Sequence, residues 1–309
     1  MSEITIKKGN IVSNFKIFAG VLAVILLAAL IMGIIVGGFN LGIDFTGGTL
    51  VSIEMGGEFD DKDVKAVIEK LNISVDYTIA KTGELGSATQ AAVRFQSMPT
   101  VEEEDDFITA MVDGIKETYP AAEAISTDRV GATAGKTLVQ NAFFSVLLAS
   151  ALMLIYIWIR FELVSGIIAV ITSVLNVLVM CAFMVFFRSF MQINSSFIAA
   201  CLTIVGYSIN NTIIVLDRIR EDNRRLGRRT FTRKEVAEHA LRSCMGRMIN
   251  TTITSLITIT VLYILGVDSI RQFALPLIIG IAAGTYISIF IVPAMWGIWM
   301  DKAPSPKKA

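Results

Sequence analysis

The sequence is poor in the residue types that most catalytic and metal sites require. Of its 309 residues only 17% are charged, three are cysteine and one, His239, is histidine, whereas 54% are hydrophobic. Soluble domains carry about 25% charged residues, so this balance excludes an ordinary soluble domain and predicts a polytopic membrane protein. His239 is far from any cysteine pair with metal-ligand spacing. We therefore predict no metal, no cofactor and no enzymatic activity, and we assign structural roles to Cys181, Cys201 and Cys244.

Six stretches are apolar over the roughly 20 residues that a helix needs to cross a bilayer. The first is longer than the apolar core of a signal peptide, and no small-x-small cleavage site follows it, so we interpret it as a retained anchor. The predicted spans are residues 15–38, 138–159, 163–187, 194–216, 249–267 and 273–299.

The net charge of zero hides a strong asymmetry along the chain. Residues 39–137 contain 18 acidic and 8 basic side chains, whereas residues 217–247 contain 10 basic and 5 acidic ones. Positively charged loops stay in the cytoplasm, so both termini and the basic loop are predicted to be cytoplasmic and the acidic segment to lie outside. The predicted parts are residues 1–38 (cytoplasmic N-terminus and first span), 39–137 (outside domain), 138–216 (spans two to four), 217–247 (basic cytoplasmic loop), 248–300 (spans five and six) and 301–309 (cytoplasmic tail).

The acidic segment has the pattern of a small α+β domain without cysteines. Alternating and turn-flanked runs predict four strands, and two runs have helical spacing, the second opened by a Thr100–Glu103 capping box. The order βαββαβ is typical of a ferredoxin-like unit. The predicted fold class is an α-helical polytopic membrane protein with six transmembrane helices and an inserted ferredoxin-like domain. The strands are expected at 49–55, 75–80, 90–96 and 123–129, and the helices at 60–71 and 100–119.

The run EEEDD at 102–106 has two interpretations. It is a cation site or partner-binding face, or it is a solvated first helical turn, where the helix dipole favours acidic side chains. No carboxylate pair with a nearby base indicates catalysis here.

A glycine-containing segment, GATAGKT at 131–137, joins this domain to the second span. It resembles a phosphate-binding loop, but Val130 stands where that motif needs glycine. We instead predict a flexible hinge that contains Gly131 and Gly135.

A second such segment, NLGIDFTGGTL at 40–50, follows the first span. Gly47 and Gly48 permit tight backbone geometry, and Asp44 is expected at the membrane surface. The segment is either a turn with an interface role or part of a hinge for domain movement.

Polar residues deep in the predicted spans are amides and hydroxyls rather than carboxylates. An unpaired amide in lipid costs several kcal/mol, so these groups are expected to face one another inside the bundle. Interhelical hydrogen bonding without a transport role is an alternative. On the fourth span helical spacing places two stripes side by side. The first contains Thr203, Tyr207, Asn210, Ile214 and Asp217, and the second contains Ser208 and Asn211.

Six segments occur in one order over nearly the whole chain. They are GIDFTGGT (42–49), the approach to the second span (130–138), IYIWIRFE (155–162), GYSINNTIIVLDRIRE (206–221), RMINTTITS (247–255) and IRQFALPLIIGIAAGTYISIF (270–290). Together they resemble the SecF branch of the SecD/SecF family of bacterial protein-export membrane proteins, which is related to the resistance-nodulation-division exporters.

The resemblance implies a multi-pass protein of the bacterial plasma (inner) membrane with a role in protein export. With SecD as partner, it would use the proton-motive force to help draw unfolded preproteins through the SecYEG channel. YajC is a further candidate partner, membrane lipids surround the spans, and no nucleic acid or cofactor is implied.

The resemblance also implies roles for single residues. The family's fourth span often carries Ser-x-Asn-Asp-Thr, whose aspartate is implicated in proton movement, and an arginine near the start of the fifth span assists it. Arg247 matches the arginine, but Asn211 stands where the aspartate is expected. Because asparagine does not ionise, we hypothesise that SecD supplies the carboxylate and that Arg247 tunes it. Tyr207, Ser208, Asn210 and Asn211 would then complete a polar path.

Both ends of the basic loop admit two interpretations. Asp217 and Arg218 are a cytoplasmic gate, which the resemblance favours, or a solvated helix end. Residues 232–247 are predicted to form an amphipathic helix on the membrane surface. Nucleic-acid binding is the rival meaning of a basic run, but the aromatic interleaving that it favours is missing here.

Three other functions stay open at this point. Sodium coupling is one, because amide and hydroxyl oxygens suit a bare cation. Export of small molecules or lipids is another, although such exporters usually carry two six-span halves in one chain. The third is a purely structural scaffold for SecD, since this chain lacks the expected carboxylate.

Overall fold

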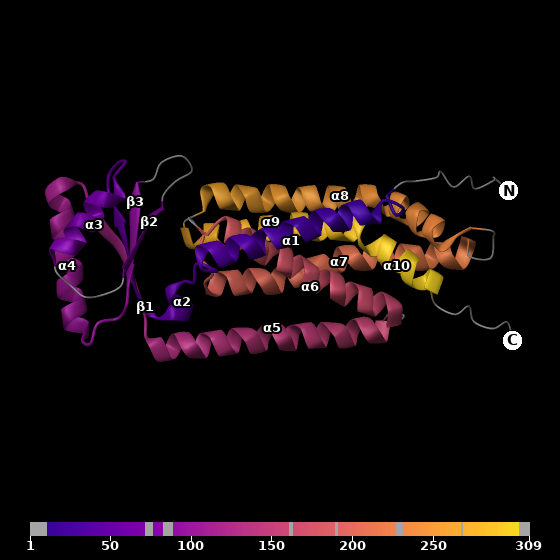
Figure 1. Ribbon diagram of the computed structural model, residues 1–309, viewed down its shortest axis with the longest axis horizontal. Helices are drawn as coiled ribbons and strands as arrows, with labels where there is room; N and C mark the ends of the chain where they lie inside the picture. The colour runs from indigo at the N-terminus through magenta and orange to yellow at the C-terminus, as the bar shows by residue number, and fades with distance from the viewer. Residues whose placement is uncertain are drawn as a thin grey trace.

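The computed structural model describes residues 11–71, 77–82, 89–160, 163–188, 191–226, 231–266 and 268–302. A small domain of strands and helices lies at one end, and a long helical bundle extends from it (Figure 1). The bundle contains six helical stretches that are long and apolar enough to cross a membrane, as the hydropathy pattern predicts. These stretches are Phe15–Val36, Gly135–Ile157, Val164–Phe186, Ser195–Arg225, Arg233–Leu265 and Ile270–Asp301.

The small domain, called the sheet domain below, spans residues 48–130. Its elements follow the predicted order of strand, helix, strand, strand, helix, strand, and its strands form one antiparallel sheet in the order β2-β3-β1-β4. Both helices lie on the face of the sheet that points away from the bundle (Figure 1). Part of the turn predicted between the second and third strands lies outside the described residues. The elements are β1 (Gly48–Glu54), α3 (Asp61–Lys70), β2 (Tyr77–Thr82), β3 (Gln90–Phe95), α4 (Val101–Thr118) and β4 (Glu123–Val130).

The core of the sheet domain lies between the sheet and its two helices. Val51 and Ile53 alternate on β1 and so point to the same face, while Met111 and Ile115 are four residues apart on α4 and share a helix face. All four are at most 1% exposed. Full burial of such a side chain contributes about 1.5–3 kcal/mol, so this core stabilises the domain without a disulfide.

The acidic first turn of α4 is only partly solvated. Thr100 caps the helix by accepting a hydrogen bond from the N–H of Glu103 at 3.3 Å, which is one of the two hydrogen bonds of the predicted capping box. Glu104, however, is buried; it accepts a hydrogen bond from Thr49 Oγ1 at 2.6 Å and pairs with Arg129 Nε at 2.7 Å. The interpretation of this turn as solvated is therefore wrong for Glu104, whose carboxylate ties α4 to β1 and β4.

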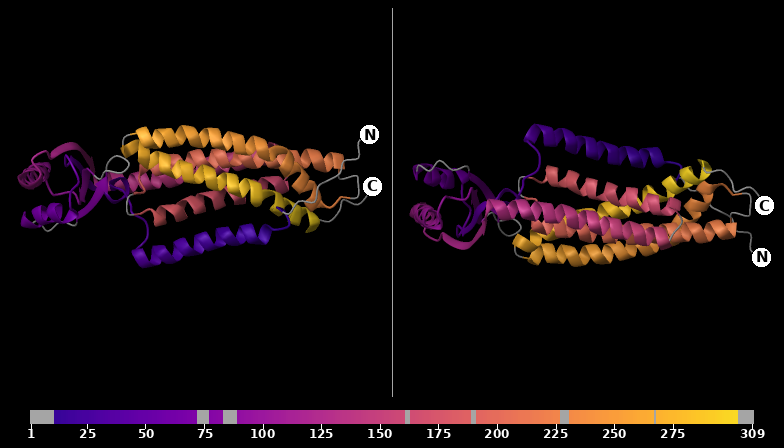
Figure 2. Two further views of the ribbon diagram at one scale, coloured as in Figure 1. Left: turned by 90° about the horizontal axis from the view of Figure 1, so that it is seen from above. Right: turned by 90° about the horizontal axis from the view of Figure 1, so that it is seen from below.

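The bundle is built around α7, which packs against α5, α6, α8 and α9. α1 lies at one edge of the bundle beside α6 (Figure 2). The outer faces of α1 and α5 are apolar and exposed, as Ile34 and Leu148 show, which suits contact with lipid or with another apolar helix. The helices are α1 (Phe15–Val36), α5 (Ala132–Arg160), α6 (Leu163–Phe186), α7 (Ser195–Leu226), α8 (Arg233–Leu265), α9 (Asp268–Phe290) and α10 (Val292–Lys302).

Two of the helices extend well beyond the predicted spans. α7 continues for 32 residues to Leu226, and α8 is one continuous helix of 33 residues that starts at Arg233. The helix predicted over 232–247 is therefore present but is continuous with the fifth span rather than separate, and the cytoplasmic position of residues 217–247 stays a prediction. At 1.5 Å per residue each helix is longer than the roughly 30 Å of a bilayer core.

Local side-chain pairs explain why these charged segments are helical. Glu221 pairs with Arg218 at 2.7 Å and with Arg225 at 3.3 Å, at the spacings that stabilise a helix surface. Thr232 and Glu235 form a capping box at the start of α8. The charges from which a cytoplasmic loop is predicted thus also stabilise helix.

The predicted sixth span is also divided. α9 ends at Phe290, Ile291 forms a turn, and α10 begins at Val292. Pro293 has no N–H to continue the α9 ladder and fits the first turn of a new helix. The span predicted over 273–299 is confirmed within Ile270–Asp301, and the structure adds a break in the helix at Ile291.

Candidate functional site

Asn210 and Asn211 lie on different faces of α7, because consecutive residues of a helix are about 100° apart. Asn210 is exposed at the surface of the bundle together with Thr203 and Asp217, whereas Asn211 and Ser208 are at most 1% exposed. The division into two stripes that the spacing predicts is present. The expectation that both stripes face the bundle interior is wrong for the first one.

A second row of exposed polar residues lies on α8 beside the first. Tyr207 joins the two rows, because its hydroxyl lies 3.1 Å from Ser255 Oγ and 3.4 Å from the carbonyl oxygen of Thr251. We call the combined surface the exposed stripe. Its members are Thr203, Tyr207, Asn210 and Asp217 on α7, and Arg247, Asn250, Thr251 and Thr254 on α8.

The exposed stripe has polar groups that this chain does not satisfy. The amides of Asn210 and Asn250 make no side-chain hydrogen bond to the residues that the structure describes. Such groups cost several kcal/mol each when they face hydrocarbon. The stripe is therefore suited to a surface that another polar helix covers, and is poorly suited to lipid.

The charged members of the stripe are also unpaired. Neither Arg247 nor Asp217 has an ion-pair partner among the described residues. Arg218, in contrast, donates to Ser243 Oγ at 2.8 Å and pairs with Glu221. Arg218 thus ties α7 to α8, and the role of Asp217 and Arg218 as a cytoplasmic gate stays a prediction.

Ser208 and Asn211 belong to a second group of polar residues, called the buried layer below. Asn211 Nδ2 donates to Thr285 Oγ1 at 3.2 Å, and Thr285 Oγ1 lies 2.8 Å from Thr252 Oγ1. The buried layer joins four helices at the middle of the bundle. Its members are Thr172, Ser173 and Asn176 on α6, Ser208, Asn211 and Thr212 on α7, Thr252 on α8, and Thr285 and Ser288 on α9.

The segment GIAAG at 280–284 allows these helices to approach closely, as the pattern of small residues predicts. A Cβ atom on Gly284 would lie 2.7 Å from Asn176 Nδ2 and 3.5 Å from Ser208 Cβ, and one on Gly280 would overlap Ile204. Glycine at 284 therefore brings the polar side chains of α6 and α7 against α9.

Sequence reasoning missed several members of the buried layer. Ser173, Thr285 and Ser288 are hydroxyl residues in otherwise apolar spans, and single hydroxyls there are a weak signal. Thr285 follows GIAAG directly and Ser288 lies one turn further on. Their position directly after this close-packing segment was the one sequence signal that they lie inside the bundle.

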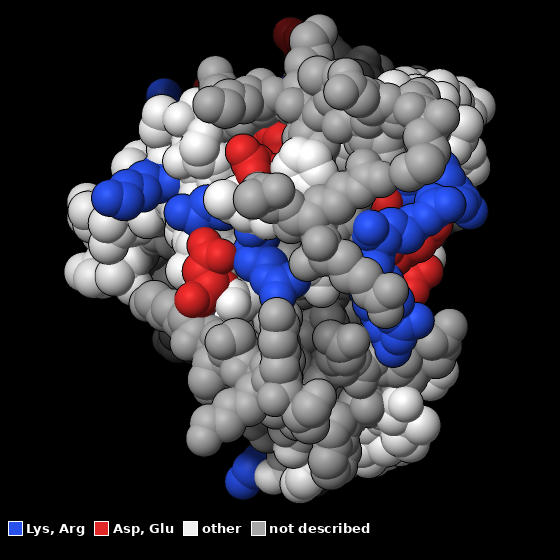
Figure 3. Space-filling model, turned by 90° about the vertical axis from the view of Figure 1, so that its right-hand side faces the viewer, with Lys and Arg blue, Asp and Glu red and all other residues white. Residues whose placement is uncertain are grey.

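A further missed cluster lies where α7 and α8 emerge from the bundle. Asp222 and Glu238 are buried there; Asp222 Oδ2 lies 2.8 Å from His239 Nδ1, and Glu238 pairs with Arg242 at 3.1 Å. Glu238 also accepts the N–H of Val12 at 2.9 Å, which ties the segment before α1 to α8. Figure 3 shows this end of the molecule, where basic and acidic side chains gather.

Asp44 lies at the junction of the bundle and the sheet domain, on the short helix α2 (Ile43–Thr46). Its Oδ2 accepts the backbone N–H of Ser195, the first residue of α7, at 2.7 Å. The first N–H groups of a helix need acceptors from outside it, and a carboxylate there is also favoured by the helix dipole. Asp44 therefore links α2 to the helix that carries both asparagines.

Gly135 lies against the same short helix. A Cβ atom there would lie 3.2 Å from the carbonyl oxygen of Asp44 and 3.3 Å from the backbone nitrogen of Gly47, whereas one on Gly131 would meet nothing within 4 Å. Residues from Ala132 onward belong to α5. The segment is thus helical from Ala132 and Gly135 packs on α2, and its role as a hinge stays a prediction.

Gly47 and Gly48 connect α2 to β1 with backbone φ angles of 71° and 119°. These values lie in the left-handed region that side chains with a Cβ rarely adopt. A Cβ on Gly48 would also lie 2.5 Å from the carbonyl oxygen of Phe95. The two glycines thus permit a tight connection at the base of the sheet domain that a residue with a Cβ would strain.

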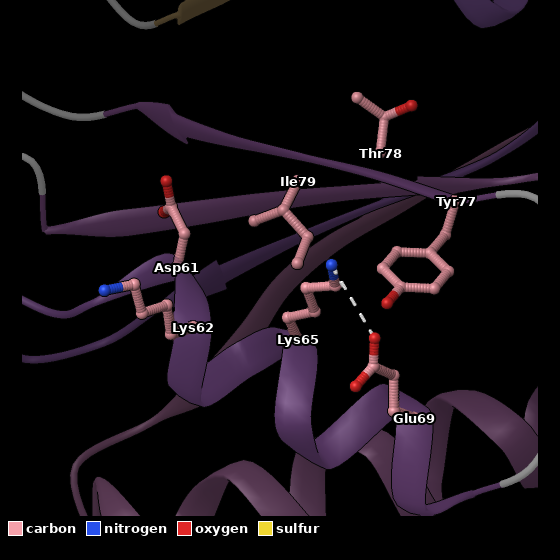
Figure 4. Close-up of a pocket in the computed structure, with 7 residues that line it drawn as sticks. All are labelled: Asp61, Lys62, Lys65, Glu69, Tyr77, Thr78 and Ile79. Atoms are coloured by element: carbon pink, nitrogen blue, oxygen red, sulfur yellow. Dashed lines mark ion pairs between the residues drawn. The ribbon is translucent and has the colours of Figure 1, made fainter.

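The sheet domain also has a surface pocket between α3 and β2. Tyr77 and Ile79 point from β2 toward α3, Thr78 points away, and Lys65 pairs with Glu69 at 3.7 Å (Figure 4). Two lysines and two acids balance its charge, and the lining holds no nucleophile with an adjacent base. Among the described residues, no three metal-ligating side chains of His, Cys, Asp or Glu are grouped. The lining residues are Asp61, Lys62, Lys65, Glu69, Tyr77, Thr78 and Ile79.

Sequence comparisons connect this geometry to known proteins. The family model "Protein export membrane protein SecD/SecF, C-terminal" matches residues 110–302, and "SecD/SecF GG Motif" matches residues 33–56. The chain is 33% identical to protein translocase subunit SecF of Helicobacter pylori, over 92% of this chain and 86% of that protein. It is 34% identical to the SecF subunit of Sebaldella termitidis, over 88% and 85%. It is 32% identical to protein translocase subunit SecDF of Bacillus subtilis, over 85% of this chain and 34% of that protein.

The solved structures show a similar arrangement. The crystal structure of SecDF, a translocon-associated membrane protein from Thermus thermophilus, superposes with a TM-score of 0.80 at 25% identity. The superposition covers 97% of this chain and 40% of that chain. This chain therefore corresponds to less than half of the SecDF protein.

Proposed function

Because the chain belongs to the SecD/SecF family of protein export membrane proteins, we propose that it is the SecF-type subunit of a SecD–SecF complex. This complex uses the proton-motive force to promote translocation of unfolded preproteins through SecYEG. The chain itself performs no catalysis, and YajC is a further candidate partner. The chain lies in the bacterial inner membrane with its termini in the cytoplasm and its ferredoxin-like sheet domain outside.

The exposed stripe is the observation that carries this proposal. It places unpaired amides and an unpaired arginine on one face of α7 and α8, and a second polar helix that covered them would remove the cost of exposing them to lipid. The Bacillus subtilis and Thermus thermophilus relatives are single SecDF proteins of which this chain spans 34% and 40%. The remainder of such a protein is its SecD-type part, which is the natural source of the helices that cover the stripe.

The stripe also suggests how protons take part. Asn210 does not ionise, so the proton carrier is a carboxylate of the SecD-type subunit that lies opposite the stripe. Arg247 is the positively charged neighbour that favours the ionised form of such a carboxylate. One proton that crosses 100 mV releases about 2.3 kcal/mol, which is sufficient to bias a two-state movement of the helices.

The junction at α2 offers a route from that movement to the sheet domain. Asp44 is bonded to the start of α7, and Gly135 packs the start of α5 against the same short helix. β1 begins two residues after α2 ends. A shift of α7 along its axis would therefore displace the base of the sheet domain, which on this proposal acts on the preprotein outside the membrane.

Photo-crosslinking from single positions tests this proposal. A photoreactive residue replaces Asn210 or Thr254 in the exposed stripe, and in a matched control it replaces Ile253, which is exposed on α8 beside the stripe. After irradiation of native membranes we expect a SecD-type chain to be captured from positions 210 and 254 and much less from 253. Tagged chain extracted in mild detergent is expected to co-purify with SecD-type and SecYEG subunits.

The captured partner decides between the remaining functions. A SecD-type chain with an aspartate in the matching helix supports proton coupling through that residue. A SecD-type chain without one leaves the assembly in place but contradicts proton coupling. Equal lipid labelling from all three positions, with no Sec subunit in the purified material, overturns the proposal and returns small-molecule or lipid export to consideration.

A further inference from the structure

The two edge strands of the sheet domain differ in how well they are protected from pairing with another strand. On β4, Ala124 and Ser126 pair with successive residues of β1, so the strand bulges at Ile125, and bulges disrupt an edge. β2 pairs with β3 in an unbroken register from Tyr77 to Thr82, and no described strand pairs with its other side. β2 therefore presents a regular row of backbone N–H and C=O groups.

The other usual forms of edge protection are also missing from β2. The strand contains no proline, and its single charged residue is Lys81. The Lys81 ammonium donates to the carbonyl oxygen of Phe59 at 2.6 Å and lies 3.8 Å from Asp61, so it is already engaged within the domain. Natural proteins usually protect such edges with charges, prolines or bulges, so the regular, unprotected edge of β2 indicates a place where a further strand binds.

The surface pocket between α3 and β2 lies beside this edge. It has a volume of about 490 Å³, and the partly exposed side chains of Tyr77 and Ile79 point from β2 toward α3 (Figure 4). Side chains alternate along a strand, so a strand added to β2 would place every second side chain over this pocket. Backbone hydrogen bonds would then supply affinity, and the pocket would select apolar side chains.

The charges around the pocket indicate which segment fits. Lys65 pairs with Glu69 at 3.7 Å, and Asp61 lies near the Lys81 ammonium. Lys62, in contrast, has no ion pair with a described residue. The pocket thus has one unpaired positive charge within a segment, residues 39–137, that contains 18 acidic and 8 basic side chains. An acidic side chain that faces α3 would complement this charge.

We propose that the β2 edge binds an extended, unfolded polypeptide segment as an additional strand. Apolar side chains of the segment lie over Tyr77 and Ile79, and an acidic side chain faces Lys62. This inference rests on the proposed function, which brings unfolded preprotein to the sheet domain, and it names the surface that holds the preprotein. Recognition through the backbone tolerates many sequences, as a route shared by different preproteins requires.

Peptide binding to the full chain in lipid nanodiscs tests this surface. The probe is a short fluorescent peptide of alternating valine and threonine with one central glutamate, and fluorescence anisotropy measures its binding against empty nanodiscs. The same peptide with methyl groups on consecutive backbone nitrogens is the control, because it cannot donate strand hydrogen bonds. We expect saturable binding of the first peptide and binding at least about tenfold weaker for the second.

Charge variants locate the bound peptide on the domain. Lys62→Glu is expected to weaken binding of the glutamate peptide about threefold, the size of effect typical of an exposed ion pair. It is expected to strengthen binding of a peptide with lysine at the same position. Lys116→Glu is the matched control, because Lys116 is exposed on α4, away from the pocket. That variant is expected to bind both peptides as the unmodified chain does.

Photo-crosslinking distinguishes the two edge strands. A photoreactive residue replaces Thr78 on β2 or, as the matched control, Thr127 on β4, and both threonines are exposed. A biotin-labelled form of the glutamate peptide is expected to attach from position 78 and much less from position 127. In native membranes, a preprotein of known sequence that is stalled during export is expected to show the same preference.

Each outcome decides the proposal. Equal binding of the two peptides, or equal capture from the two strands, overturns it. Capture of a SecD-type chain or a second copy of this chain from position 78, in place of peptide and preprotein, also overturns it, because β2 is then a subunit interface. If a variant fails to fold, the comparison of the two peptides on the unmodified chain still decides.

Failure of this inference can be told apart from failure of the proposed function. Binding of a free peptide needs neither a SecD-type subunit nor a proton gradient. Absence of peptide binding therefore leaves assembly through the exposed stripe intact. Absence of crosslinks from the exposed stripe would overturn the proposed function, whereas the peptide measurement would still report whether β2 binds an extended segment.

Discussion

The two faces of α7 carry the same kind of residue in opposite situations. Asn210 belongs to the exposed stripe and makes no side-chain hydrogen bond to a described residue, whereas Asn211 is fully buried and donates to Thr285. One amide therefore has no hydrogen-bond partner among the described residues of its own chain, and the other is held by a neighbouring helix. Adjacent residues of one type thus lie in opposite surroundings within a single turn.

The difference arises from the neighbouring helices rather than from α7 itself. On the buried side Gly284 lets α9 approach, and Thr285 and Thr252 supply hydroxyls. On the exposed side α8 contributes Arg247 and Asn250, whose side chains point away from the bundle. Changes on the two faces are therefore expected to separate association with the partner from stability of the chain.

The largest effect is expected from Arg247→Ala on the exposed stripe. Loss of one partner from a desolvated charge pair costs about 2–5 kcal/mol, so association with the SecD-type subunit and proton-dependent export should both fall sharply. The chain's own Tm should stay the same, because Arg247 forms no ion pair with the described residues. Export into membrane vesicles with and without a proton gradient, and co-purification, measure the two effects.

Arg224→Ala is the control for that change. Arg224 is an exposed arginine near the end of α7, outside the stripe. Equal loss of export for the two arginine variants would show that overall charge, rather than the position of Arg247, matters, and would contradict the proposed role of the stripe.

Two glycine-to-alanine changes compare how much each face of α7 contributes to the stability of the chain. Gly284→Ala places a Cβ 2.7 Å from Asn176 Nδ2 in the buried layer, and such overpacking costs about 1–3 kcal/mol. Gly206→Ala, in the same row of α7 as Asn210, meets nothing within 4 Å, and replacing helical glycine by alanine stabilises by about 1 kcal/mol. Unfolding of the isolated chain in detergent measures both. Destabilisation by Gly206→Ala would show that this face is already packed within the chain.

Much of this architecture is predictable from the sequence because hydropathy and helical spacing are local. The six spans, the order of elements in the sheet domain and the division of α7 into two stripes all follow from such patterns. The burial of each stripe does not follow from local patterns, because whether Asn210 or Asn211 faces inward depends on where α8 and α9 pack. The helical extension beyond 216 was missed because charge was interpreted as loop, although Glu221 pairs with arginines at helical spacing. A helix was predicted over 232–247, but its continuity with the fifth span was not.

The polar residues of the bundle were likewise only partly predictable from the sequence. Arg247 and Asn211 were identified through a family resemblance, and the pattern GIAAG indicated close packing. The meeting of Asn176 with Ser208 against Gly284 joins residues from three helices, and a single sequence carries no signal for contacts at such distances along the chain. The bond from Asp44 to Ser195 was hidden for the same reason.

Asp44→Ala tests the hydrogen bond that holds the start of α7, the helix to which both faces belong. The change removes the acceptor for the Ser195 N–H at the start of α7, and loss of a helix cap costs about 1 kcal/mol. Asp44→Asn keeps an acceptor oxygen and is the control, which should lose only a fraction of that amount. Thermal unfolding compares the three proteins; identical Tm values would mean that the bond does not contribute to holding α7.

The smallest effect is expected from the adjacent asparagines themselves. Asn210→Leu removes interhelical hydrogen bonds to the partner, which in membranes average about 0.6 kcal/mol each, so association with the SecD-type subunit should weaken only two- to threefold. Asn211→Leu should leave association unchanged, because Asn211 is fully buried within this chain. Energy transfer between labelled subunits in vesicles resolves such differences. Equal effects of the two variants would show that the faces are coupled, and the buried layer would then take part in partner recognition as well.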